Sequence, residues 1–328
     1  MFRHISIALF VLVSSYCQVH TKKIVMLAPP HAANVNTFIS VGRALTAMGH
    51  TTYVTIPDSM VRAKSVNVNG VLPIYFGKDY PDYDSAVGAQ SGSQFWNNQT
   101  DGISSVTSVV HMANDLINRL LSDHDLLQQL KRIDPDLFVF GHVVMARNIV
   151  TMAYMMDKPF VAMSAINDYT SQRIPISLSA SPTQIYGGYR LEGMTFQQRF
   201  FNSLANLLMT TITAYTSSED LVAKYVPDRP TISTDRILAK AEIFILECDP
   251  IMDYARPTMP NVKFVGSTAG KDGSELKEPY KSFVDKSEHG IVIVTLGSYF
   301  KDYPEYASSK MISAFMVNIL LFFLPYVW

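Results

Sequence analysis

The sequence predicts an α/β fold built on a parallel sheet. Short apolar runs rich in β-branched residues alternate with longer segments in which apolar residues recur at helical spacing. Strand, helix and strand in this order form a βαβ unit, whose two strands lie parallel in one sheet. A composition that is 48% hydrophobic and 17% charged suffices for a large core, and a length of 328 residues suggests two domains.

The first βαβ unit is predicted near the amino end. Residues 23–28 form an apolar run that predicts the first strand, and the run ends at Pro29-Pro30-His31. Apolar residues then recur at helical spacing from Asn34 to Met48, and Gly49 supplies a C-terminal stop. Residues 51–56 predict the second strand because they are rich in β-branched side chains.

The pattern repeats downstream and then changes. Helices are expected over 103–120, 122–133, 146–156 and 200–215, and strands over 137–140, 159–163, 241–246 and 262–265. Residues 267–287 are rich in Gly, Lys, Asp, Glu and Ser, which is typical of an exposed interdomain linker. Residues 288–298 then predict a buried strand that runs into a Gly-Ser turn, as a second nucleotide-binding unit would open, followed by a helix over 306–317.

The first twenty residues have the layout of a secretory signal. A short basic region, residues 1–4, precedes an apolar region over 5–13 and a stretch of small and polar residues that ends at Cys17. Its removal would leave one cysteine, Cys248, and therefore no internal disulfide. The triplet Asn98-Gln-Thr is a glycosylation acceptor, which fits a lumenal location.

Charge and motifs exclude several function classes. A formal net charge of -1 gives no electrostatic reason to expect a nucleic-acid partner. The histidines show no metal-ligand spacing, and neither a Gly-x-Ser-x-Gly elbow nor a phosphate-loop Gly-Lys-Ser/Thr occurs. The aspartates near Pro250 and Pro257 are interpreted as part of a surface turn.

Several short blocks, in a fixed order, carry a family resemblance. They are Lys23-Ile-Val-Met-Leu with a histidine shortly after it, Met48-Gly-His50, Lys158-Pro-Phe-Val161, Met194-Thr-Phe-Gln-Gln-Arg199, Arg256-Pro-Thr-Met-Pro-Asn-Val-Lys-Phe-Val-Gly266 and Gly290-Ile-Val-Ile-Val-Thr-Leu-Gly-Ser298. Over residues 1–315 the chain resembles UDP-glycosyltransferases of the animal UDP-glucuronosyltransferase type.

The resemblance implies a GT-B fold and its domain plan. A signal peptide (1–20) would precede a complete N-terminal Rossmann-like domain that binds the acceptor (21–268). A linker (269–288) would lead to the first strand and helix of a C-terminal Rossmann-like domain (289–328), which binds the UDP-sugar. The resemblance also implies the endoplasmic reticulum, with the catalytic domains in its lumen. Without an anchor the chain would be secreted.

The resemblance assigns His31 as the catalytic base. Transfer of a sugar to a hydroxyl requires a base, and histidine titrates near working pH. In this family an aspartate after the middle strand orients the histidine, but here residues 141–143 are Gly-His-Val. His142 is a possible orienting partner, although it cannot stabilise an imidazolium as a carboxylate does. Asp134 and Asp136 lie at the wrong end of that strand.

The donor side is represented by Gly297 and Ser298, which match the family loop that approaches the diphosphate. The expected function is transfer of glucuronic acid or another hexose from UDP-sugar to a small lipophilic hydroxyl, with inversion. UDP-sugar is the co-substrate, and no cofactor or metal is expected. Because the family's donor signature and anchor helix do not occur in these 328 residues, this chain by itself is expected to transfer no sugar.

A second hypothesis belongs to another class. The chain would be a non-catalytic lumenal protein that binds lipophilic ligands or modulates a full-length transferase by pairing with it. Two apolar stretches, 200–215 and 311–328, could touch a membrane. The first could equally be a core or acceptor-site helix, and Asn318 and Pro325 argue against spanning by the second.

Overall fold

The computed structural model describes residues 21–83, 85, 96, 102–141, 144–164, 172–173, 194–249, 258–268, 273, 275–295 and 304–316. Its elements, in chain order, are β1 (Lys23–Leu27), α2 (Ala32–Ala47), β2 (Thr51–Pro57), α3 (Asp58–Arg62), β3 (Leu72–Phe76), α5 (Gly102–Ser122), α6 (His124–Ile133), β4 (Leu137–Gly141), the 3-10 segment η1 (Val144–Val150), α7 (Thr151–Met156), β5 (Phe160–Ser164), α9 (Phe196–Thr216), α10 (Asp220–Tyr225), α11 (Thr234–Leu238), β6 (Phe244–Leu246), β7 (Val262–Phe264), α12 (Tyr280–Asp285) and α13 (Glu305–Met316).

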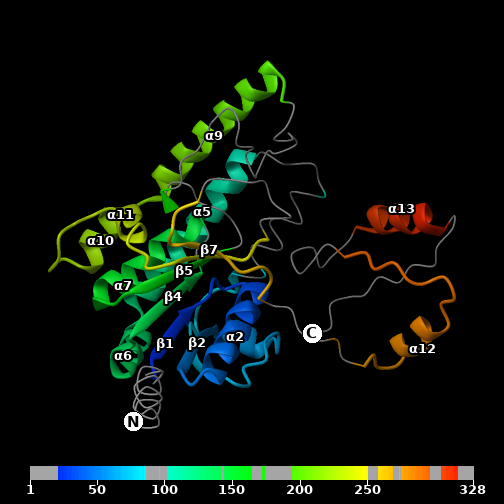
Figure 1. Ribbon diagram of the computed structural model, residues 1–328, viewed down its shortest axis with the longest axis horizontal. Coiled ribbons are helices and arrows are strands. Elements are labelled where there is room, and N and C mark those ends of the chain that lie inside the picture. The colour runs from blue at the N-terminus through cyan, green and yellow to red at the C-terminus, as the bar shows by residue number, and fades with distance from the viewer. Residues whose placement is uncertain are drawn as a thin grey trace, which may run out of the picture.

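The described strands form one parallel sheet, as predicted. Their order is β3-β2-β1-β4-β5-β6-β7, so β1 lies between β2 and β4 (Figure 1). Every neighbouring pair is parallel, with Ile24 opposite Thr52 on one side and Leu137 on the other. From β1 the chain first builds outward to β3 and then returns to build the other half from β4. This is the doubly wound arrangement of Rossmann-like folds.

Both faces of the sheet are buried, which explains the near-continuous apolar strands. On β1 the side chains of Val25 and Leu27 enter one core cluster, while Ile24 and Met26 enter the other. The first cluster is covered by buried residues of α5, α6, α7, α10 and α11. The second is covered by α2, through Val35, Phe38 and Ile39, and by Met60 of α3. The domain is therefore a three-layer sandwich.

Strand β3 was not predicted from the sequence. It contains Pro73, which lacks an N–H for the ladder and argues against a central strand. The structure accommodates Pro73 because β3 is at the edge of the sheet and pairs only with β2, with Val54 opposite Pro73. The helix expected over 146–156 is also divided, because η1 is kinked at Ala146 before α7 begins.

The strand expected at 288–298 is not a strand where it is described. Residues 291–295 have no sheet assignment, and the side chain of Ile293 is 63% exposed rather than buried. An isolated strand leaves its backbone N–H and C=O groups without a ladder, so it needs neighbouring strands to form. The helix expected after it is present as α13. In Figure 1, α12 and α13 stand clear of the sheet.

Helix α9 is amphipathic, but it exposes its apolar side and buries polar side chains. It projects beyond the sheet (Figure 1) and exposes half or more of Phe200, Leu204, Leu207 and Leu208. Its buried side includes the polar residues Asn202 and Asn206. The core-helix interpretation of residues 200–215 is therefore wrong for these apolar side chains, which face away from the protein.

Candidate active site

The loops that follow β1 and β4 diverge at the carboxyl edge of the sheet. The chain leaves β1 toward β2, whereas the segment after β4 leads to β5 on the opposite side. Such a topological switch point leaves a crevice in which doubly wound folds bind ligands. His31 lies on the β1 side of this crevice, between the end of β1 at Leu27 and the start of α2 at Ala32. His31 thus follows β1 at the carboxyl edge of the sheet, and its role as the base stays a prediction.

His31 is the N-cap residue of α2. Its backbone is extended, with φ -126° and ψ 132°, and the backbone N–H of Ala33 donates to its Nδ1 at 3.2 Å. The residue is only 9% exposed. A nitrogen that accepts a hydrogen bond carries no proton, so in this arrangement the proton of a neutral ring is on Nε2. The imidazole therefore satisfies one of the free N–H groups at the start of the helix.

A close contact joins the two sides of the crevice. Gly141 ends β4, and a Cβ placed on it would lie 2.0 Å from Cδ of Pro29. Glycine therefore lets the pyrrolidine ring pack directly on the end of β4. The Pro29 carbonyl in turn accepts the backbone N–H of His31 at 2.7 Å. The end of β4 thus sets the position of the loop that carries His31.

The remaining predicted site residues lie outside the described part of the chain. His142 is next to Gly141 in the sequence but is not among the described residues, and the same holds for Gly297, Ser298, Asn98 and the expected signal, 1–20.

Asp134 and Asp136 lie at the amino end of β4, away from His31, as predicted. Asp136 accepts the backbone N–H of Lys23 at 2.8 Å, and Asp134 accepts from Lys158 at 2.7 Å. Each hydrogen bond holds the pKa of its carboxyl below the usual value. Neither residue replaces the family aspartate, and both instead connect the amino ends of neighbouring strands.

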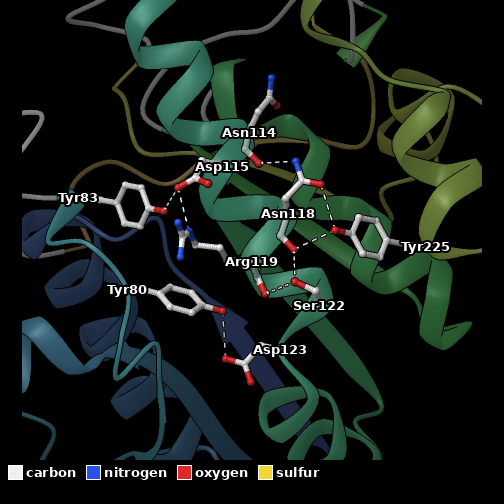
Figure 2. Close-up of polar contacts among 9 residues, drawn as sticks. All are labelled: Tyr80, Tyr83, Asn114, Asp115, Asn118, Arg119, Ser122, Asp123 and Tyr225. Atoms are coloured by element: carbon white, nitrogen blue, oxygen red, sulfur yellow. Dashed lines mark hydrogen bonds and ion pairs between the residues drawn. The ribbon is translucent and has the colours of Figure 1, made fainter.

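Two tyrosines after β3 are held by acids from α5 and from the start of α6, an arrangement that was not predicted from the sequence. Figure 2 shows that the Tyr83 hydroxyl donates to Asp115, which also pairs with Arg119 at 3.0 Å. The Tyr80 hydroxyl donates to Asp123 at 3.1 Å (Figure 2). Of these contacts, only the Asp115–Arg119 pair could be predicted from the sequence, because opposite charges four residues apart on one helix lie side by side.

Electrostatics keep these tyrosines in the donor state. Burial raises the pKa of Tyr83 and of Tyr80, and the neighbouring carboxylates act in the same direction. The hydrogen bond from Tyr83 holds the pKa of Asp115 below its usual range. The phenols therefore act as hydrogen-bond donors and not as proton acceptors, so His31 remains the candidate base among the described residues at this edge.

Two cavities lie beside these tyrosines. A small inner cavity of about 10 Å³ is lined by Pro30, Pro57, Tyr83 and Leu116, among others, and it adjoins the His31 loop through Pro30. An outer pocket of about 640 Å³ opens next to the end of β3. Its lining combines Tyr75, Phe76 and Tyr80 with a larger number of charged or polar residues, namely Asp58, Arg62, Lys78, Asp79, Asp123, Asp125 and Gln129. The volume of the outer pocket falls in the range of small-molecule sites.

The described residues lack two features, a metal-binding cluster and a membrane-spanning helix. They contain no group of three or more His, Cys, Asp or Glu side chains placed to hold a metal ion. Among the helices that the structure describes, none is both long enough and apolar enough to cross a membrane.

The described strands and helices define a Rossmann-like domain with a topological switch point at the carboxyl edge of its sheet. Residues 23–319 match the model of the family described as UDP-glucoronosyl and UDP-glucosyl transferase, and the chain belongs to this family. The chain is 31% identical over 141 residues to human UDP-glucuronosyltransferase 1A6, which covers 42% of the chain and 26% of that protein. It is 25% identical over 288 residues to human UDP-glucuronosyltransferase 1A8, covering 85% of the chain and 54% of that protein.

A solved structure confirms the fold class. The glycotransferase of kitacinnamycin superposes with a TM-score of 0.50 at 15% identity, over 92% of this chain and 64% of that chain. The fold is therefore of the GT-B type. Rat UDP-glucuronosyltransferase 1-2 is 24% identical over 88% of the chain and 56% of its own length, so the chain spans about half the length of the curated relatives that it matches over most of its sequence.

Proposed function

We propose that the protein transfers glucuronic acid or another hexose from UDP-sugar to a hydroxyl of a small lipophilic acceptor, with His31 as general base. The observation that carries the proposal is the position of His31, which is buried in the loop after β1 at the carboxyl edge of the sheet, next to Pro30, a residue that lines the small inner cavity. Family membership supports the donor class. The reaction uses UDP-sugar as a co-substrate and needs no resident cofactor or metal.

The proposed chemistry is a single displacement. The acceptor oxygen forms a bond to the anomeric carbon while the bond from that carbon to the diphosphate breaks, so UDP leaves and the configuration inverts. His31 takes the hydroxyl proton at Nε2. For this the ring proton must first be on Nδ1, which requires the hydrogen bond from Ala33 to be exchanged for an acceptor. We propose His142 as that acceptor, and Gly297 and Ser298 as contacts to the diphosphate.

The test uses a chimera, because the chain spans about half the length of its relatives. Residues 1–288 are joined to the C-terminal portion of human UDP-glucuronosyltransferase 1A8, and transfer from radiolabelled UDP-glucuronic acid to phenol is measured. His31→Ala is expected to lower kcat about 10²- to 10⁴-fold, the usual contribution of a general base. The KM for the UDP-sugar should change little.

His50→Ala is the matched control. His50 lies at the amino edge of the sheet, where its Nδ1 accepts from the backbone of Lys22 at 3.4 Å, and its loss should leave kcat nearly unchanged. Transfer by the His31→Ala chimera within tenfold of the parent would overturn the assignment of the base. A parent chimera that binds phenol but transfers nothing would instead favour the non-catalytic lipophile-binding alternative.

We also propose that the protein enters the secretory pathway and resides in the endoplasmic reticulum, where it associates with the membrane and pairs with a full-length transferase. The signal-like pattern of residues 1–20 and the acceptor triplet at Asn98 support this location. In animal cells, glycosidase treatment should increase the gel mobility of the chain. Asn98→Gln should remove this shift and Asn97→Gln should not. An unchanged mobility of the parent chain would contradict the proposed location.

A further inference from the structure

The inner cavity lies where the ends of three neighbouring strands meet. Each strand end contributes a proline to the lining, namely Pro30 after β1, Pro57 at the end of β2 and Pro81 in the loop after β3. Strands β3, β2 and β1 are neighbours in the sheet, so these ends follow one another along its carboxyl edge. Because the proline ring fixes the backbone angle φ, the walls of the cavity have little freedom to adjust.

Tyr83 closes this cavity beside helix α5. Its side chain is only 8% exposed and lines the cavity together with Leu116 of α5. The volume of about 10 Å³ has room for at most one water molecule. In so small a space the wall formed by Tyr83 cannot move far without changing the packing of Pro30 on the other side. The position of Tyr83 is therefore coupled to the loop that carries His31.

The hydroxyl of Tyr83 holds its ring in place. It donates to Asp115, and the same carboxylate accepts from Nε of Arg119 at 3.0 Å (Figure 2). The hydrogen bond from Tyr83 lowers the pKa of Asp115, so the acceptor is ionised at neutral pH. A hydrogen bond to an ionised acceptor is stronger than one between neutral groups. Since Asp115 precedes Leu116 on α5, the residue that holds the hydroxyl is next to one that lines the cavity.

A second tyrosine fixes the rest of the loop after β3. The Tyr80 hydroxyl donates to Asp123 at 3.1 Å, and its ring meets Phe76 edge-on with centroids 6.0 Å apart. Gly77 has φ +73°, and a Cβ there would lie 2.8 Å from Cγ of Tyr80, so glycine lets this ring pack on the loop backbone. The loop is therefore attached at two points, to the start of α6 through Tyr80 and to α5 through Tyr83.

On the other side of the cavity, Pro30 belongs to the turn that holds the candidate base. The backbone N–H of His31 donates to the carbonyl of Pro29 at 2.7 Å, and Pro30 lies between these two residues. The His31 ring in turn accepts the backbone N–H of Ala33. Pro30 cannot shift without moving the backbone from which the imidazole extends. A change in the wall formed by Tyr83 should therefore reach His31.

We propose that Tyr83 is a positioning residue for the candidate base, because its bond to Asp115 holds the wall of the inner cavity that packs toward Pro30. This inference rests on the proposed function and adds a residue that acts on the base through the His31 loop. Without the hydroxyl the wall would be less firmly held, and the loop would open more often. The imidazole would then be more accessible to reagents and would spend less time in position to take a proton.

The first test measures the access of a reagent to His31 in the 328-residue chain and does not depend on catalysis. Diethyl pyrocarbonate acylates accessible imidazoles, and mass spectrometry follows the reaction in tryptic peptides. The peptides 24–43 and 44–62 each contain a single histidine, His31 and His50 respectively. Tyr83→Phe should raise the rate at His31 about tenfold, the factor that the loss of one hydrogen bond typically makes in an equilibrium. The rate at His50 should stay that of the parent, whereas a general loss of structure would raise both rates.

Two further variants sharpen this test. Asp115→Ala removes the acceptor and should reproduce the effect of Tyr83→Phe, which gives a second reading if one variant folds poorly. The double variant should react no faster than either single one, because both changes remove the same contact. Tyr75→Phe is the matched control, since it also removes a tyrosine hydroxyl but Tyr75 does not line the inner cavity. Its rate at His31 should equal that of the parent.

The second test uses the chimera described above. Tyr83→Phe should lower kcat about tenfold, in proportion to the opening of the loop, and leave the KM for UDP-glucuronic acid unchanged. If neither Tyr83→Phe nor Asp115→Ala raises the rate at His31, or if Tyr75→Phe raises it equally, the positioning role is refuted while His31 as base stands. A Tyr83→Phe chimera with the kcat of an active parent would also refute it. If the rates change as expected but every form of the chimera is inactive, the proposed function fails and the control of the loop by Tyr83 stands.

Discussion

His31 combines a structural task with the proposed chemical one, and the two compete for the same ring nitrogen. As the N-cap of α2 it accepts the N–H of Ala33 at Nδ1, whereas a base that works through Nε2 needs a proton on Nδ1. Binding of substrate would therefore have to compensate for the loss of a cap, which typically contributes about 0.5–2 kcal/mol. The chemistry and the local stability of this helix are linked through one side chain.

The sequence predicted the place of His31 but not its capping role. Ser, Thr, Asp and Asn are the usual N-cap residues, so a histidine before a helix gives no capping signal. The hydrogen bond from the Tyr83 hydroxyl to Asp115 could not be predicted either, because the two residues are far apart in the sequence and only the fold brings them together. Short-range sequence patterns indicate local structure only. The Tyr83–Asp115 contact joins the loop after β3 to helix α5, so such patterns do not contain it.

A single methyl group at Gly141 should disturb the loop of the candidate base. Gly141→Ala would place a Cβ 2.0 Å from the ring of Pro29, which cannot move aside as a flexible side chain would. We expect a loss of about 1–3 kcal/mol in the free energy of unfolding, the usual range for overpacking. Urea denaturation measures the loss, and the His31→Ala phenotype should be partly reproduced in the chimera.

Gly273→Ala provides the comparison for this change. Nothing lies within 4 Å of a Cβ added at Gly273, so its urea midpoint should match that of the parent. Equal midpoints for all three proteins would show that the contact between Pro29 and the end of β4 does not constrain the loop.

At the scale of elements, strong periodicity and caps were informative. The run over 23–28, the helix that Gly49 stops and the helix expected over 122–133 all correspond to observed elements, and Gly49 has the positive φ, +93°, expected of a helix stop. Asp123 caps α6 by accepting the backbone N–H of Leu126. These signals act within a few residues, so the sequence alone contains them.

Elements whose identity depends on their surroundings were less predictable. Strand β3 can contain Pro73 because it lies at the edge of the sheet, and the residues around Pro73 give no signal that a strand there would be an edge strand. Helix α9 has apolar residues at helical spacing, which is the pattern of a core helix, yet it exposes them and buries Asn202 and Asn206. Periodicity indicates that a helix has two different sides, but it does not say which side faces the protein.

At the scale of the molecule, the amino edge of the sheet should make stability depend on pH. The carboxyls of Asp134 and Asp136 have pKa values lowered by hydrogen bonds from Lys158 and from the Lys23 backbone. A lowered folded-state pKa gives stability that is present above the unfolded value, about 3.9, and is lost as pH falls through the folded-state pKa. The urea midpoint should therefore decrease as pH falls below about 5.

Asp136→Asn should reduce this dependence, because the amide can still accept the Lys23 N–H without titrating. The effect should be small, since both carboxylates are largely exposed to solvent. Asp79→Asn makes the same charge change at the opposite, carboxyl edge of the sheet, just after β3, and should leave the dependence of the urea midpoint on pH as in the parent. If the urea midpoint of Asp136→Asn fell with pH as steeply as that of the parent, the Asp136 carboxylate would not be a source of the pH dependence.

The central position of β1 also has a consequence for synthesis of the chain. β1 pairs with β2 soon after both emerge from the ribosome, but its other neighbour, β4, begins only at Leu137. Until then one edge of the future central strand has no partner and can pair with other chains. Of the two pairings that β1 makes, the one with β4 forms last, so the nascent chain cannot form the switch point beside His31 until β4 has been made. For more than a hundred residues of translation, this lateral edge of β1 is therefore open to pairing with other chains.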